Sequence, residues 1–141
     1  MRKIFILILA LSLAACLFGC NGGEPMSGGG KSEITGCTVS FYYGVASLGS
    51  FNSSVTEEKD ITLSTGTTYE IGLRPTFRGS KEAVYVGDCA EFSFPDGAFE
   101  ISYIGDTDHE PRYELKVLCD TEAELTVDVD GYVQRIKISP S

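Results

Sequence analysis

Short runs that alternate between apolar and polar residues fill the chain from residue 37 to residue 138, and turn signals separate them. A period of two gives each run one apolar and one polar face, as in half-buried β-strands. No window carries a helical period of useful length. The sequence therefore predicts an all-β fold, an antiparallel sandwich of about seven strands. The nine runs from which these strands would be drawn are residues 37–43, 61–64, 68–74, 83–86, 90–94, 99–103, 113–117, 125–129 and 132–138.

Turn residues support this division. Pro95-Asp96-Gly97 separates two of the runs, and Asp130-Gly131 suits a two-residue hairpin turn that requires positive φ. The polar, Gly/Ser-rich passage 44–60 is expected to be mainly loop.

Several of these runs resemble the group 2 bacterial Ig-like modules. The likeness rests on 61–63 with Gly66, on 69–71, and on 123–127 followed by 136–138. Residues 120–123 depart from the Gly-Thr-Ala-Thr-like step of that family. The resemblance implies an Ig-like β-sandwich.

The first 20 residues have the layout of a secretion signal. Arg2 and Lys3 precede an apolar run that is too short to cross a bilayer, which needs about 20 residues. Leu13-Ala14-Ala15-Cys16 resembles the lipobox of bacterial lipoproteins, in which the cysteine receives a diacylglycerol. Cys20, after Leu17-Phe18-Gly19, is the alternative attachment residue. The resemblance implies a lipid-anchored protein on the extracytoplasmic face of the cell membrane.

Residues 21–33 are rich in glycine and have no apolar period, so they are expected to form a flexible tether. Residues 34–141 would then form the Ig-like sandwich. A chain of this length is enough for one ordinary domain with a modest core.

The net charge of the chain is −9, from 11 basic and 20 acidic residues. It falls to about −11 once Arg2 and Lys3 leave with the signal. This surplus repels phosphate backbones, so we expect no nucleic-acid partner. It also gives no attraction to anionic lipid, so membrane attachment would depend on the acyl chains.

Three cysteines remain in the predicted domain: Cys37, Cys89 and Cys119. An odd count allows one disulfide and leaves one thiol. In a sandwich Cys37 and Cys89 would begin two strands at the same end, whereas Cys119 would lie at the other end. Cys37–Cys89 is therefore the predicted pair, and three reduced thiols are the alternative.

The densest polar cluster is 106–110. Asp106, Asp108 and Glu110 could offer oxygen ligands to Ca²⁺, but the spacing lacks a calcium-loop pattern, so an acidic turn is favoured and no metal is predicted. His109 is the only imidazole, so a zinc site would lack a second histidine ligand. A nucleophilic cysteine or serine would have no other histidine as its base. No cofactor and no enzymatic activity are expected.

Two kinds of binding function remain. The absence of a catalytic pattern beside an anchor and a tether favours a noncatalytic structural or protein-interaction domain in the cell envelope. The alternative is a carbohydrate- or small-ligand-binding surface module, which would need aromatic residues clustered on an exposed face. The candidates for such a platform are Tyr42, Tyr85, Tyr103 and Tyr132.

Overall fold

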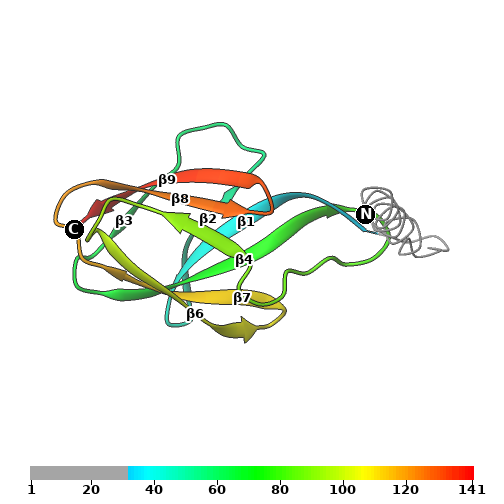
Figure 1. The fold of residues 1–141 in the computed structure, drawn as a ribbon, viewed down its shortest axis with the longest axis horizontal. Helices are drawn as coiled ribbons and strands as arrows, with labels where there is room; N and C mark the ends of the chain where they lie inside the picture. The colour runs from blue at the N-terminus through cyan, green and yellow to red at the C-terminus, as the bar shows by residue number, and fades with distance from the viewer. Residues whose placement is uncertain (1–31) are drawn as a thin grey trace, which may run out of the picture. The chain divides into compact units, whose positions relative to one another are not determined.

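A computed structural model describes residues 32–141, which form two packed β-sheets (Figure 1). The predicted signal, both candidate lipidation cysteines and the tether before Ser32 lie outside the described residues. The strands are β1 (Glu33–Tyr43), β2 (Ala46–Asn52), β3 (Asp60–Leu63), β4 (Thr68–Arg78), β5 (Ala90–Ser93), β6 (Phe99–Thr107), β7 (Glu110–Val117), β8 (Ala123–Val129) and β9 (Tyr132–Pro140).

One sheet has five strands in the order β2-β1-β4-β7-β6, and the other has four in the order β3-β9-β8-β5. All strand pairs are antiparallel except β3 and β9, which run parallel from Asp60 opposite Lys137. The β8–β9 hairpin turns at Asp130-Gly131, where both residues have positive φ (52° and 85°). This is the turn that the Asp-Gly step predicts.

The core lies between the two sheets and is built from the alternate, apolar positions of the strands. Phe41, Ile71 and Leu115 come from the five-stranded sheet, and Leu125 and Ile136 face them from the four-stranded sheet. All five side chains are fully buried. The alternation in the sequence thus arises because every second residue of each strand faces this one core.

The predicted all-β sandwich is confirmed, with nine strands where about seven were expected. Strand β2 lies within the passage 44–60 that was expected to be mainly loop, and it forms an edge of the five-stranded sheet. Residues 83–86, expected to be a strand, are irregular. Only Tyr85 of this run is buried, and its hydroxyl donates to the carbonyl of Gly36 (3.1 Å), whereas Val84 and Val86 are exposed.

Candidate binding groove beside strand β9

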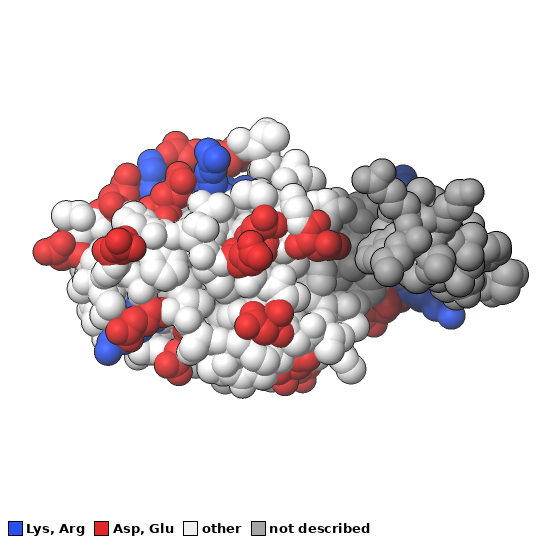
Figure 2. All heavy atoms as spheres, in the orientation of Figure 1, with Lys and Arg blue, Asp and Glu red and all other residues white. Residues whose placement is uncertain are grey.

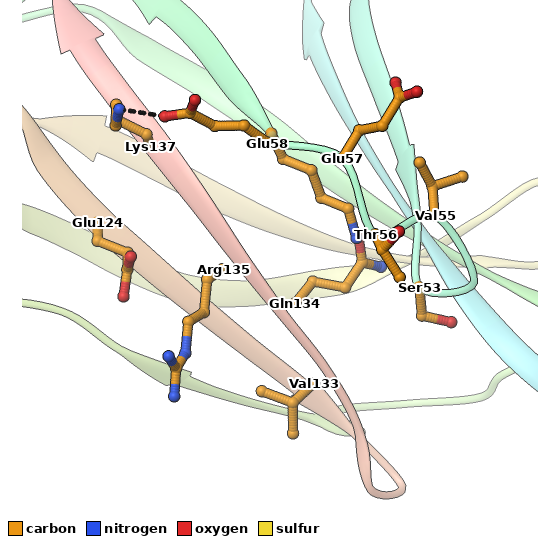
Figure 3. A pocket seen from close by; sticks show the side chains of 11 residues that line it. Ser53, Val55, Thr56, Glu57, Glu58, Glu124, Val133, Gln134, Arg135 and Lys137 are labelled. Carbon is orange, nitrogen blue, oxygen red and sulfur yellow. Dashed lines mark hydrogen bonds and ion pairs between the residues drawn. The ribbon is translucent and has the colours of Figure 1, made fainter.

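A surface cavity of about 470 Å³ lies between β9 and the 53–59 loop that joins β2 to β3 (Figure 3). We call this cavity the β9 groove. Its size is within the range usual for ligand sites. It is lined by Ser53, Val55, Thr56, Glu57, Glu58, Lys59, Glu124, Val133, Gln134, Arg135 and Lys137.

Gln134 forms the inner wall of the β9 groove. Because alternate side chains of a strand point to opposite faces, Gln134 points inward while Val133 and Arg135 point out. The Gln134 amide donates to the carbonyl of Cys37 (2.8 Å) and accepts from the Lys59 ammonium (3.0 Å). Both ends of a buried amide are thus satisfied, and the groove has a fixed polar floor.

The rim of the β9 groove carries both signs of charge. Lys137 forms ion pairs with Glu58 and with Glu122 (3.9 Å). The side chain of Lys137 draws the pKa of the Glu58 carboxyl below its usual value, first through the hydrogen bond and then through its charge. Val133 is half exposed and adds an apolar surface. The arrangement can offer hydrogen bonds, charge and apolar contact, as binding surfaces do.

A second polar cluster, the Glu110 cluster, lies on the outer face of the five-stranded sheet. The Glu110 carboxylate is fully buried and accepts from Arg74 (3.2 Å), Arg112 (3.4 Å) and the Tyr42 hydroxyl (3.2 Å). The Arg112 guanidinium lies 4.1 Å from the centre of the Tyr42 ring, a cation–π distance. The carboxylate is therefore enclosed by its partners.

The carboxylates of Asp106, Asp108 and Glu110 do not converge. Asp106 lies opposite Pro111 in the β6–β7 register, so Asp106 and Glu110 point to opposite faces of the sheet. Asp106 accepts from the Tyr103 hydroxyl (2.7 Å), while Asp108 lies in the turn with a φ of 53°. Among residues 32–141 no group of three potential metal ligands comes together.

The three thiols are free in the structure, so the predicted Cys37–Cys89 disulfide stays a prediction. Cys37 is buried in β1, and burial raises the pKa of its thiol to about 12 despite a hydrogen bond with Tyr85. The charge of Cys89 also acts on this pKa, and burial raises the pKa of Cys89 itself. Neither thiol is therefore activated as a nucleophile.

The four candidate tyrosines do not share one exposed face. Tyr85 is buried, Tyr42 lies in the Glu110 cluster on the outer face, and Tyr132 is partly buried with its hydroxyl donating to the carbonyl of Ile34 (2.9 Å). Tyr103 packs against the buried Tyr113, with ring centres 5.5 Å apart. The structure thus does not assemble them into one stacking platform.

His109 lies in a smaller hollow of about 300 Å³ between β4, the β6–β7 turn and the irregular segment 82–84. Phe77 and Val84, both exposed to more than a third, form its apolar wall. The polar residues that line it are Arg74, Glu82, Asp108 and His109. An exposed aromatic ring beside such groups is the kind of surface that small polar ligands use.

The sequence interpretation did not identify the β9 groove or the Glu110 cluster. Glu110 was considered only as a residue of an acidic turn and as a candidate Ca²⁺ ligand, whereas its partners are Arg74 on the neighbouring β4 and Arg112 on its own strand. The sequence also showed that the alternating pattern of β9 is interrupted at Gln134, where a polar residue occupies an inward position. A buried amide of this kind needs partners, which here come from distant residues.

Comparison of the chain with protein-family models, with curated proteins and with solved structures finds no significant match. A search of residues 32–141 for a helix long and apolar enough to span a membrane finds none.

Proposed function

We propose that this chain is a lipid-anchored protein of the cell envelope whose β-sandwich acts outside the cytoplasm as a noncatalytic module that binds a protein partner. The observation that carries the interaction role is the β9 groove. It combines an apolar surface, a fixed polar floor and a charged rim on the surface of a single domain.

The anchor rests on the lipobox-like residues that end at Cys16 or Cys20. Acyl chains would hold the protein at the membrane, and the glycine-rich residues 21–33 would let the domain reach a partner. The acidity of the chain, which leaves acidic side chains prominent on the face in Figure 2, would favour partners with basic surfaces.

Site-specific photo-crosslinking in the native host cells tests the interaction role. A crosslinking amino acid replaces Arg135 in the β9 groove, and the matched control carries it at Lys116 on the outer face of the other sheet. We expect one protein species, identified by mass spectrometry, to be linked at position 135 and not at 116. Equal yields at both positions, or none at either, would argue against a partner at the groove.

Mass spectrometry of the mature N-terminus tests the anchor. We expect a diacylglyceryl cysteine, and the Cys16→Ser and Cys20→Ser variants identify which residue carries it. An unmodified cysteine behind an intact signal would contradict lipid anchoring.

A second candidate function is the binding of a glycan or other small polar ligand in the hollow beside Phe77 and His109. A thermal melt of the protein against a panel of cell-wall and host glycans tests it. A ligand at 100 times its dissociation constant adds about 2.7 kcal/mol, which raises the melting temperature by several degrees. The shift should disappear in Phe77→Ala, and a flat response to the panel would count against this function.

A further inference from the structure

Strand β9 is paired along the whole of one edge but along only part of the other. β8 pairs with it from Tyr132 to Ile138. On the opposite side β3 pairs only from Lys137 to Pro140. The edge of β9 before Lys137 therefore faces the β9 groove instead of another strand (Figure 3).

The odd-numbered residues of β9 direct their backbone groups to this second edge. Towards β3, the N–H of Lys137 donates to the carbonyl of Lys59 (2.8 Å) and that of Ser141 to the carbonyl of Leu63 (3.0 Å). Alternate residues of a strand direct their backbone groups to the same side, so Val133 and Arg135 direct theirs into the groove.

The hairpin supports this assignment from the other side. Val129 and Tyr132 face each other across the two-residue turn, so the even-numbered residues of β9 exchange hydrogen bonds with β8. Outside the β8–β9 ladder, no backbone hydrogen bond within residues 32–141 uses the N–H or the carbonyl of Val133 or Arg135. Two donors and two acceptors are thus aligned and open along the groove.

We propose that this open edge of β9 is a β-strand addition site, where an extended, basic segment of a partner protein pairs with Val133 and Arg135. Aligned backbone groups on a free strand edge are the surface that β-augmentation uses. The inference rests on the proposed interaction function and names the surface and the chemistry of the partner.

The side chains around the edge fit alternate positions of an added strand. Those that point outward would meet the half-exposed Val133, and those that point inward would meet Gln134. The start of β3 at Asp60 limits the addition at one end, so the added segment is short. Main-chain hydrogen bonds would give affinity, and these two surfaces would select side chains.

Charge favours a basic segment. Lys137 is already compensated by Glu58 and Glu122, whereas Glu57 and Glu124 on the rim have no ion pair within residues 32–141. Lys59, which bonds the Gln134 amide, and Arg135 are the opposing charges, so the uncompensated charges of the groove balance and the preference for a basic segment rests on the charge of the whole chain. The net charge of the whole chain, −9, adds a field that attracts basic partners and repels acidic ones.

The test measures peptide binding to the full chain in a neutral detergent by isothermal titration calorimetry. The probe is an eight-residue peptide, blocked at both ends, that alternates lysine and valine. The control peptides replace lysine with glutamate or methylate alternate backbone nitrogens. We expect the lysine peptide to bind at least about tenfold more tightly than either control, because one control loses charge attraction and the other its backbone donors.

Val133→Pro gives a matched test on the protein. Of the backbone donors, proline removes only the N–H of residue 133, which points into the groove and not towards β8. Proline is tolerated on a free strand edge, so the pairing with β8 is retained. We expect binding of the lysine peptide to weaken about tenfold, while Val133→Ala, which keeps the N–H, binds nearly as the wild type does. If Val133→Pro does not fold, Arg135→Pro and the methylated peptide make the same test.

Equal binding of the lysine and methylated peptides, or no binding of any peptide, would overturn strand addition. Tighter binding of the glutamate peptide would overturn the basic partner. A crosslinked partner at position 135 without peptide binding would leave the proposed interaction standing and refute only its strand-addition form. Peptide binding without any crosslinked partner in cells would count against the proposed function instead.

Discussion

Glu110 and Gln134 are both fully buried polar side chains, but their surroundings differ. Glu110 lies between paired strands, where two arginines and a tyrosine enclose its carboxylate. Gln134 lies beside a strand edge that ends its pairing at Lys137, and its amide borders an open groove. The comparison indicates that the first cluster is closed off by its own partners, whereas the second lines the surface at which we propose that a partner binds.

Replacement of Glu110 should have the largest effect on stability. Glu110→Gln removes the buried one of two carboxylates that pair with Arg112, the other being the partly exposed Glu70 (3.3 Å). Breaking a buried ion pair costs about 3–5 kcal/mol. The exposure of Arg74 places the expected loss near the lower value, about 3 kcal/mol. Urea unfolding measures it.

Glu114→Gln is the matched control, because Glu114 lies on the same strand and face but is exposed. Its effect should stay within about 0.5 kcal/mol. Similar small losses in both variants would show that the Glu110 cluster is not a stabilising unit.

Gly72→Ala should come next, because a Cβ at position 72 would lie 1.9 Å from Glu110 Oε1. Such overpacking costs about 1–3 kcal/mol. The double variant Gly72→Ala/Glu110→Ala removes the atom that clashes, so its loss should be smaller than the sum of the single losses. Additive losses in urea unfolding would mean that the glycine is not needed to accommodate the carboxylate.

Gln134→Leu should destabilise the domain less than Glu110→Gln, by about 1–2 kcal/mol. It removes two hydrogen bonds, one to the carbonyl of Cys37, which keeps the Ser53 N–H as a donor (2.8 Å), and one from the Lys59 ammonium. Each such bond contributes about 0.5–1.5 kcal/mol. No charge is left unpaired in the interior, which is the reason for the smaller effect. A loss as large as that of Glu110→Gln in the same urea experiment would remove the distinction between the two regions.

Alkaline pH should weaken the inner wall of the β9 groove through Cys37. The thiol pKa is raised to about 12 in the folded protein from 9.0, so both states hold the proton below pH 9 and only the folded state holds it above. Stability therefore falls as the pH rises from 9 towards 12, with about 1 kcal/mol lost by pH 10.

Urea unfolding of wild type and Cys37→Val at pH 8, 9 and 10 checks this, and the variant should lose about 1 kcal/mol less. Equal pH dependence in both would contradict a protonated, buried thiol. A change of wild-type mobility on a non-reducing gel after reduction would show a disulfide. Cys37 would then have no thiol to titrate, and the predicted Cys37–Cys89 bond would explain an equal pH dependence of the two proteins.

The sequence predicted what depends on local patterns. Alternation defined most strands, and Asp130-Gly131 defined the hairpin, because both features act within a few residues. Strand β2 was missed because its edge position leaves it largely exposed, so it carries little apolar alternation. Residues 83–86 had the opposite outcome, since their run of apolar residues resembles a strand, yet the segment is irregular and only Tyr85 in it is buried.

The two polar regions depend on contacts that no local pattern encodes. Glu110 meets Arg74 from another strand, and Lys59 meets Gln134 from a loop 75 residues away. The β9 groove results from where the pairing of β3 stops, which follows from the packing of the whole sheet. The tyrosines were predicted as a group from their number, but their positions in the fold separate them.

Amide hydrogen exchange at residue resolution, on the full chain without any peptide, tests the open edge of β9 most directly. The account predicts fast exchange at Val133 and Arg135 and slow exchange at Gln134 and Ile136, because only the even-numbered amides donate to β8. Equal protection at all four amides would contradict the open edge, and with it the proposal that a partner strand binds there.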